Sequence, residues 1–504
     1  MSTIRRQSII SSIVVYFGFA LGFVNTYLFT REGSGFTQAE YGLIGAFISI
    51  ANIMASFAGL GMTAYVNKFF PYYKDNLEPS KNDMMSWSLL ISVIGFILVA
   101  SGGWIFKELV IRKFGTNAPD LVTYYKWVFP FGFGLTFFLL FEAYSWHLGK
   151  SVLVNFLREV LFRLFTTLLI VLLGIGLIKD FDLFIKIYSF TYILLFITLF
   201  LLLWKAGNVH FHFKVSHVTR RFKKKILLLV SFVWGGTLVY TISNTFDNIV
   251  IASVLKDGLA LGGIYTLAQN IASLIQAPQR GIISSSIGAL SQAWKDKDMK
   301  KISTIYHRSS INQMIFSIGM FVLIWINFID GVFTFHLQKE FIASQQVFLF
   351  IGLMRIVDMG TGVNAQIIAT SIYWRFEFLS GIVLILITLP LNYFLTKQLG
   401  VTGPAIANLI SFTIYNLIRF IFLYRKYELQ PFNVKSLFII LLGLVGYFVS
   451  YYAFKDQQGF WWICLRSAVF LVIYVTGTIA LNISPDIRPV LQTAIKKIGL
   501  KPKN

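Results

Sequence analysis

The chain has 504 residues, of which 56% are hydrophobic and only 13% are charged. A soluble domain of this length cannot bury so much apolar surface, so the composition predicts a protein embedded in a membrane. The 44 lysines and arginines outnumber the 22 acidic residues, and they gather in short gaps between apolar runs. That spacing is typical of the cytoplasmic loops of membrane proteins, so nucleic acid is the weaker interpretation of the basic charge.

Apolar stretches long enough to cross a bilayer of about 30 Å recur along the whole chain. The first follows Arg5 and Arg6, is too long for the core of a signal peptide, and is interpreted as an uncleaved span. We predict an all-α polytopic membrane protein with fourteen transmembrane helices, over residues 9–29, 41–65, 85–106, 124–146, 159–178, 183–204, 226–251, 262–290, 309–329, 342–369, 377–395, 402–424, 437–454 and 460–482.

The basic residues also predict the orientation of these spans. Gaps on the N-terminal side hold roughly three times as many lysines and arginines as the opposite gaps. This asymmetry follows the positive-inside rule for an even number of crossings. We therefore expect a multi-pass protein of a bacterial inner (plasma) membrane, with both termini in the cytoplasm.

The longest inward gap, 205–225, carries the basic run Arg220-Arg221-Phe222-Lys223-Lys224-Lys225 near the middle of the chain. The opening of the second span, Gln38–Leu43, is loosely similar to that of the eighth, Leu261–Leu267, which indicates an internal repeat. We expect a six-helix lobe at 1–204, a basic cytoplasmic linker at 205–225, a second six-helix lobe at 226–424, and two trailing transmembrane helices with a basic cytoplasmic tail at 425–504.

Polar residues recur at helical spacing inside four spans, which predicts polar faces. They are Gln269, Ser273, Gln276 and Arg280 in the eighth span, Thr237, Thr241, Asn244 and Asn248 in the seventh, Ser49, Asn52 and Ser56 in the second, and Gly18, Gly22 and Asn25 in the first. For the first span and the Ser/Thr positions we favour helix–helix packing. For Arg280 we favour a functional site, since a guanidinium deep in a bilayer needs an anion or water.

Other charges inside the spans have two interpretations each. Arg355 and Asp358 lie three residues apart, so they either neutralise each other or meet a substrate. Asp247 and Glu142 are candidate sites for H⁺ or Na⁺ coupling, although an ion pair with an arginine explains them equally well. Arg419 lies near a span end and is expected to extend to the membrane surface.

Several classes of site are missing from the sequence. Cys464 is the only cysteine, and His210, His212 and His217 share a solvated loop that does not favour a metal site. Gly149-Lys150-Ser151 lacks the upstream glycine of a P-loop, because Tyr144 occupies that position. We therefore expect no cofactor and no enzymatic activity, with transport driven by an H⁺ or Na⁺ gradient, membrane potential or substrate gradient.

Loose motifs distributed over nearly the full chain complete the pattern. They are Glu40-Tyr41-Gly42, Gly59-Leu60-Gly61, Asp247-Asn248-Ile249-Val250-Ile251, Gly263-Ile264-Tyr265-Thr266-Leu267-Ala268 and Leu399-Gly400-Val401-Thr402-Gly403-Pro404-Ala405. With fourteen spans they resemble the multidrug/oligosaccharidyl-lipid/polysaccharide (MOP) exporter superfamily, particularly its polysaccharide-transporter branch of O-antigen-type flippases. The sequence departs from a common pattern at Ser286–Leu290, which lacks a proline near the helix end.

The resemblance implies two lobes around a cavity lined by helices 1, 2, 7 and 8. The cavity would receive a polyprenyl-pyrophosphate-linked oligosaccharide and flip it outward by alternating access, for polysaccharide biosynthesis such as that of lipopolysaccharide O-antigen. Arg280 is the first candidate to bind the pyrophosphate, because a guanidinium can bind phosphate oxygens bidentately. The expected site residues are Arg280, Gln276, Gln269, Asn244, Asn52, Asn25 and Arg355 for the substrate, and Asp247, Glu142 and Asp358 for ion coupling.

The expected partners are the lipid-linked saccharide, membrane lipids and other glycan-assembly proteins, with no nucleic acid. The alternative within the superfamily is a cation-coupled multidrug exporter, which needs an acidic cavity around Asp247 or Glu142. Two other classes are a membrane glycan polymerase and a scaffold for a glycan-assembly complex. The short outward gaps argue against the polymerase, because its catalytic groups need a sizeable loop.

Overall fold

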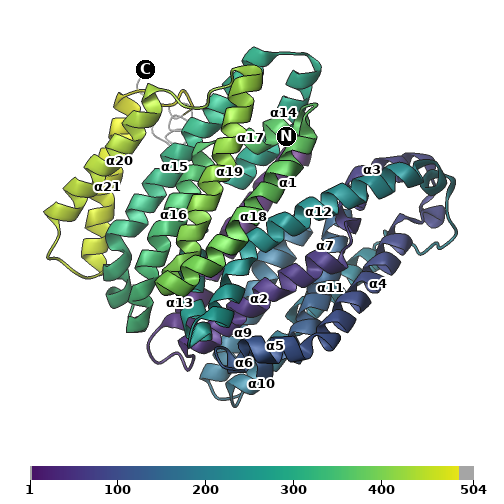
Figure 1. Ribbon diagram of the computed structural model, residues 1–504, viewed down its shortest axis with the longest axis horizontal. Helices are drawn as coiled ribbons and strands as arrows, with labels where there is room; N and C mark the ends of the chain where they lie inside the picture. Colours follow the sequence, from purple (N-terminus) through teal and green to yellow (C-terminus); the bar gives the residue numbers. More distant parts are fainter. Residues whose placement is uncertain (1–2, 487–504) are drawn as a thin grey trace. The chain divides into compact units, whose positions relative to one another are not determined.

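The computed structural model describes residues 3–486 and contains no β-strand within them. Figure 1 shows the arrangement of the helices within each part of the chain. Among the described residues, ten helical segments have the length and apolar composition needed to cross a membrane: Gln38–Ala58, Pro79–Ile105, Tyr125–His147, Phe181–Lys205, His217–Val254, Met299–Thr334, Lys339–Gly360, Trp374–Tyr427, Val434–Ala453 and Phe460–Ala480. The expected all-α polytopic membrane fold is therefore confirmed. The count of fourteen spans stays a prediction, and the basic tail beyond residue 486 lies outside the described residues.

The chain folds into two compact units that divide after Thr266. The first contains α1 (Thr3–Thr30), α2 (Gln38–Ala58), α3 (Met62–Asn76), α4 (Met84–Ile105), α5 (Lys107–Phe114), α6 (Pro119–Thr123), α7 (Val128–His147), α8 (Ser151–Asn155), the π-helix η3 (Phe156–Leu161), α9 (Phe162–Gly174), α10 (Phe181–Tyr188), α11 (Thr191–Lys205), α12 (His217–Val254) and the start of α13 (Gly258–Ala272). The predicted lobes 1–204 and 226–424 stay a prediction.

The core of the first unit is aromatic and centres on α7. Phe138, Phe141 and Tyr144 are buried there beside Leu195 and Leu199 of α11. These side chains recur at three- and four-residue spacing, so each helix presents one apolar stripe to its neighbour. The packing holds α7 against α11, α2 and α3.

The second predicted span is not one helix, and the structure corrects the expected range 41–65. Leu60 and Gly61 have positive φ values of 41° and 72°, which end α2 at Ala58 and allow α3 to begin at Met62. A side chain on Gly61 would also approach the carbonyl oxygen of Val230 within 2.9 Å. Glycine therefore meets a conformational and a steric need at this break.

The predicted linker 205–225 is shorter than expected, because α12 begins at His217. The Ser216 hydroxyl caps this helix by accepting a hydrogen bond from the Thr219 amide at 3.2 Å. The basic run Arg220–Lys225 consequently lies in the first turns of a 38-residue helix. Such a helix is about 57 Å long, so it extends well beyond a bilayer core of about 30 Å.

The second unit contains the end of α13 and α14 (Gln279–Lys295), α15 (Met299–Thr334), α16 (Ser344–Gly360), α17 (Asn364–Thr370), α18 (Trp374–Leu399), α19 (Gly403–Tyr427), α20 (Val434–Ala453) and α21 (Phe460–Ala480). The antiparallel neighbours α18 and α19 pack together, and α19 also packs on α16. The trailing helices α20 and α21 pack on each other and on α15, where Phe470 and Tyr474 join a buried cluster.

Three further predicted spans are interrupted. In the expected span 183–204, Ser189 and Phe190 separate α10 from α11. In the expected span 262–290, α13 ends at Ala272 and α14 begins at Gln279. Between them, the amides of Leu274–Ala277 each donate to the carbonyl oxygen three residues earlier, and Pro278 immediately precedes α14. The helical spacing predicts that the polar residues from Gln269 to Arg280 share one continuous helix face. The break between α13 and α14 shows that they do not. The expected span 342–369 is interrupted at Thr361–Val363, where Gly362 has φ 63°.

Candidate functional site

The predicted polar faces of α2 and α12 meet in the first unit. The Ser56 hydroxyl donates to the Thr241 hydroxyl at 2.9 Å, and the Asn248 amide donates to the Ser49 hydroxyl at 3.3 Å. These bonds join the two helices along adjoining stripes. Ser49, Ser56 and Thr241 thus act in helix–helix packing, the interpretation favoured for the Ser/Thr positions from sequence.

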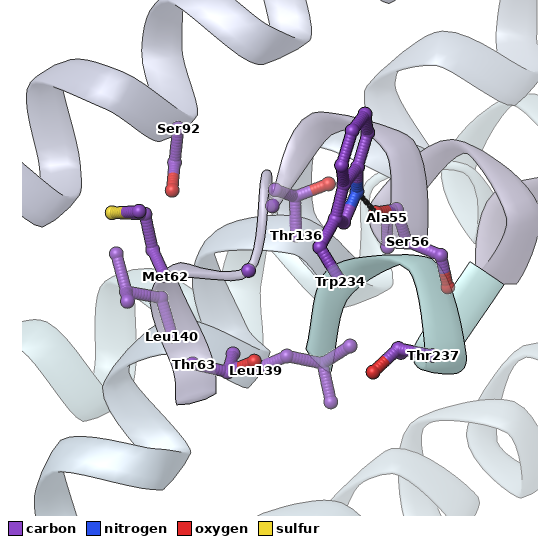
Figure 2. Close-up of a pocket in the computed structure, with 12 residues that line it drawn as sticks. Ala55, Ser56, Met62, Thr63, Ser92, Thr136, Leu139, Leu140, Trp234 and Thr237 are labelled. Carbon is purple, nitrogen blue, oxygen red and sulfur yellow. Dashed lines mark hydrogen bonds between the residues drawn. The ribbon is translucent and has the colours of Figure 1, made fainter. Parts of the chain in front are cut away.

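A small cavity lies at the break between α2 and α3 (Figure 2). Its volume is about 70 Å³, and its lining is Ala55, Ser56, Gly59, Gly61, Met62, Thr63, Ser92, Thr136, Leu139, Leu140, Trp234 and Thr237. The Trp234 indole donates to the Ser56 carbonyl oxygen at 2.9 Å, which fixes one wall. The lining is uncharged and the space suits water molecules rather than a charged headgroup.

The predicted substrate-binding amides of the first unit bond mainly to backbone. Asn52 donates to the Ile48 carbonyl oxygen at 2.7 Å, and Asn244 donates to that of Tyr240 at 2.8 Å. Both residues are half-buried, and each makes this bond within its own helix. Gln269 is half-buried near the end of α13, and Gln276 is half-buried in the turn before α14.

Asn25 links α1 to α9. Its side chain is buried, donates to the Arg163 carbonyl oxygen at 2.9 Å and accepts from the Thr167 hydroxyl at 2.5 Å. Gly18 lies nearby, where a side chain would approach the Glu159 carbonyl oxygen within 2.6 Å. The first span therefore uses its small and polar face for close helix packing.

The π-helix η3 carries charged residues into this region. Arg158 donates to both carboxylate oxygens of buried Glu142 at 3.1 Å, and Arg163 forms an ion pair with Glu159 at 2.7 Å. A π-helical turn changes the direction of the side chains around it and is frequent at functional sites. From sequence, Glu142 is open to two interpretations, ion coupling or an ion pair with an arginine. The structure provides the arginine, Arg158.

Asp247 is also buried and bonded. Its carboxylate accepts a hydrogen bond from the Tyr265 hydroxyl at 2.6 Å, and its side chain is only 1% exposed. The bond connects α12 to α13. Ion coupling through Asp247 stays a prediction.

A polar network connects four helices of the second unit, α14, α16, α17 and α19. Asp358 on α16 accepts hydrogen bonds from Gln279 on α14 and Asn416 on α19, each at 3.1 Å. Asn416 in turn accepts bonds from Thr361 and Asn364 at 3.0 Å. The network includes the interruption between α16 and α17, so it fixes the backbone where that span is broken.

Arg355 is one turn before Asp358 on α16, but the two form no salt bridge within the part of the chain that is described. The Nε atom of Arg355 is buried and has no hydrogen-bond partner among the described residues, although the residue as a whole is only half-buried. A buried guanidinium nitrogen without an acceptor is costly. This arrangement leaves Arg355 able to bind an anion.

Sequence reasoning missed two ion pairs in the second unit. Arg419 is buried, bonds to Glu377 and lies over the Tyr415 ring at 3.7 Å, so the expected extension of Arg419 to the surface is wrong. Arg466 donates to Asp330 at 3.4 Å and to four other acceptors, which lie on Ile326, Asn327, Phe454 and Gln457. Helical period finds a polar face but not the partner on another helix, which is why both pairs were missed.

The leading candidate from sequence, Arg280, is the second residue of α14. Its side chain lies outside the described residues, so its role stays a prediction. No group of three or more His, Cys, Asp or Glu side chains converges on a possible metal position within the described part.

Comparisons with known proteins support the fold. No family model and no curated protein matches the chain. Among solved structures, "Lipid II flippase MurJ, inward closed conformation" is similar with a TM-score of 0.73 and 15% identity, covering 93% of this chain and 98% of that one. An inward-facing multidrug resistance MATE family transporter of the MOP superfamily has a TM-score of 0.62 and 15% identity, with 81% and 94% covered. A further MATE structure, in complex with MaL6, has a TM-score of 0.57 and 14% identity, with 84% and 96% covered.

Proposed function

We propose that this chain, which has the fold of the MOP exporter superfamily, is a transporter that flips a polyprenyl-pyrophosphate-linked oligosaccharide across a bacterial inner membrane. The saccharide would move from the cytoplasmic to the outer leaflet by alternating access and serve polysaccharide biosynthesis, such as that of O-antigen. Coupling to H⁺ or Na⁺ and cytoplasmic termini belong to the same proposal. Other glycan-assembly proteins are its proposed partners.

The observation that carries this proposal is the unpaired guanidinium nitrogen of Arg355 inside a predicted span. An embedded cation without a carboxylate partner favours an anionic substrate. A pyrophosphate offers several oxygens to a planar guanidinium and suits bidentate binding. The net charge of +22 also favours a negatively charged substrate at the membrane surface.

The embedded carboxylates support the same choice. Glu142, Glu159, Asp330 and Glu377 each form an ion pair with an arginine. A cation-coupled drug exporter needs acidic groups that can hold a cationic compound, and a paired carboxylate has already lost much of that capacity. Asp247 and Asp358 are bonded to hydroxyl or amide groups instead.

The extent of structural similarity is a further support. The alignment with the lipid II flippase covers 93% of this chain, whereas those with the two MATE transporters cover 81% and 84%. The similarity to MATE transporters keeps the multidrug exporter as the second candidate. The two candidates differ in the charge of the transported molecule.

A transport assay with both substrate classes tests the proposal. Purified protein in liposomes receives either a fluorescent polyprenyl-pyrophosphate oligosaccharide or a cationic dye, under H⁺ and Na⁺ gradients. We expect the labelled lipid to become accessible to a quencher in the opposite leaflet, with no dye accumulation. Dye transport without lipid flipping would replace the proposal by the multidrug exporter.

A further inference from the structure

A second and larger cavity lies in the first unit, at one end of α3, α4 and α7. Its volume is about 460 Å³, and its lining is Phe70, Lys74, Leu77, Pro79, Asn82, Met85, Tyr144, His147, Leu148, Gly207, Asn208 and His210. Cavities of this size hold small ligands. None of these residues belongs to the proposed substrate site.

The walls of this cavity are built from well-bonded residues. The ring of His147 stacks on Phe70 at 4.9 Å, and its Nε2 lies 3.1 Å from the Asn67 amide oxygen. The Tyr144 hydroxyl donates to the Asn208 carbonyl oxygen at 2.9 Å, which attaches the segment after α11 to α7. These contacts fix the part of the wall that α3, α7 and the segment after α11 supply.

The adjoining linker is attached in the same way. The His212 amide donates to the Ser86 hydroxyl at 2.7 Å, and the Ser216 amide donates to the Asp83 carboxylate at 2.9 Å. Asp83 also accepts from the Thr219 hydroxyl at 2.7 Å. These bonds hold the segment that follows His210 close to the start of α4.

The lining combines basic and apolar side chains. Lys74, His147 and His210 supply cationic or protonatable nitrogens, whereas none of the lining residues is acidic. Lys74 and His210 are exposed, and Lys74 forms no ion pair within the described residues. Leu77, Pro79, Met85 and Leu148 supply the apolar side chains. This combination matches a phosphate group attached to an apolar body.

The position along the helices places the cavity at a membrane boundary. His147 ends the apolar segment Tyr125–His147, and Met85 is in the first turn of α4. Trp146 and Trp204, near the same helix ends, are 47% and 58% exposed. Exposed tryptophans are enriched at the level of lipid headgroups.

We propose that this cavity is a binding site for a phosphate-bearing anion, and that an anionic phospholipid headgroup is its occupant. Lys74 and His210 bind the phosphate, while the apolar side chains receive the start of the acyl chains. Binding there holds the linker against α3 and α4. The site is separate from transport and does not depend on the proposed substrate.

Native mass spectrometry of the full chain tests this site with three probes, dioleoylphosphatidylglycerol, dioleoylphosphatidylcholine and inorganic phosphate. We expect phosphatidylglycerol to bind more tightly than phosphatidylcholine. Lys74→Glu/His210→Glu should weaken its binding by about fivefold or more for each charge changed. Lys107→Glu/Arg112→Glu is the matched control, because both residues are exposed on α5, which follows the other end of α4. The control should bind phosphatidylglycerol like the unaltered protein.

Lys74→Arg keeps the positive charge and should retain binding. Retained binding shows that the charge of residue 74, and not the lysine side chain as such, is needed. Excess inorganic phosphate that leaves bound phosphatidylglycerol in place identifies the lipid as the occupant. Phosphate binding that depends on Lys74 and His210, without any preference for phosphatidylglycerol, supports the anion site but assigns it to free phosphate. Equal phosphatidylglycerol affinity in the Lys74→Glu/His210→Glu variant, its control and the unaltered protein would overturn the proposal.

Discussion

Gly42 on α2 and Gly263 on α13 lie against each other without side chains between them. A side chain on Gly42 would approach the Leu259 carbonyl oxygen within 1.8 Å, and one on Gly263 would approach the Gln38 carbonyl oxygen within 2.3 Å. These are the two segments whose loose similarity indicates an internal repeat. The glycines permit the close approach of two backbones, as small residues do in membrane helices.

This approach predicts opposite effects for two adjacent substitutions. Gly263→Ala places a methyl group against backbone and should lower the stability of the first unit by about 2 kcal/mol or more. Gly262→Ala is the control, because its methyl group meets nothing within 4 Å. Alanine should even favour the helix there by about 0.5–1 kcal/mol. Thermal unfolding in detergent measures both, and equal stabilities would contradict the packing of α2 on α13.

The Arg466–Asp330 pair should hold the trailing helices on α15. Arg466→Ala leaves a buried carboxylate without its cation, at a cost of about 3–5 kcal/mol. Arg308→Ala is the control, since its pair with Asp486 is exposed and should contribute at most about 1 kcal/mol. Limited proteolysis between α20 and α21 should become faster in Arg466→Ala only. Unchanged cleavage would show that packing alone anchors these helices.

Variants of the Glu142–Arg158 pair distinguish a structural role of Glu142 from a role in ion coupling. If the pair is structural, Glu142→Ala and Arg158→Ala should each destabilise the protein, with a coupling energy of about 1 kcal/mol or more in a double-mutant cycle. Transport by the surviving variants should keep the pH profile of the unaltered protein. A Glu142→Gln variant of normal stability with a shifted pH profile would instead assign ion coupling to Glu142.

Arg280 stays the first candidate for the pyrophosphate from sequence. We expect Arg280→Ala to abolish export of surface glycan while the protein still reaches the membrane. Arg375→Ala, at an exposed position of α18, removes the same charge and should leave export unchanged. Cell-surface glycan staining with membrane immunoblots measures both variants. Normal glycan in the Arg280→Ala strain would remove this residue from the site.

The sequence predicts the membrane fold well, because apolar length and basic gaps are local properties of the chain. It does not predict the break at Gly59–Gly61, because an interrupted helix keeps the same hydropathy as a continuous one. Before Gln279 the sequence does contain a signal, since Pro278 is expected to kink the helix. It also misplaces Arg419, whose partner Glu377 is on another helix. Contacts between distant segments decide these features, and a helical period contains no information on them.

The most direct measurement is the flipping rate of the labelled polyprenyl-pyrophosphate oligosaccharide in liposomes that contain Arg355 variants. Arg355→Ala removes a charge-assisted contact of about 1.5–3 kcal/mol and should slow flipping by about tenfold or more. Arg355→Lys should retain part of the rate, and Arg425→Ala, at an exposed position of α19, should retain all of it. An Arg355→Ala protein that flips the lipid at the unaltered rate would contradict the proposal that this embedded guanidinium binds the anionic headgroup.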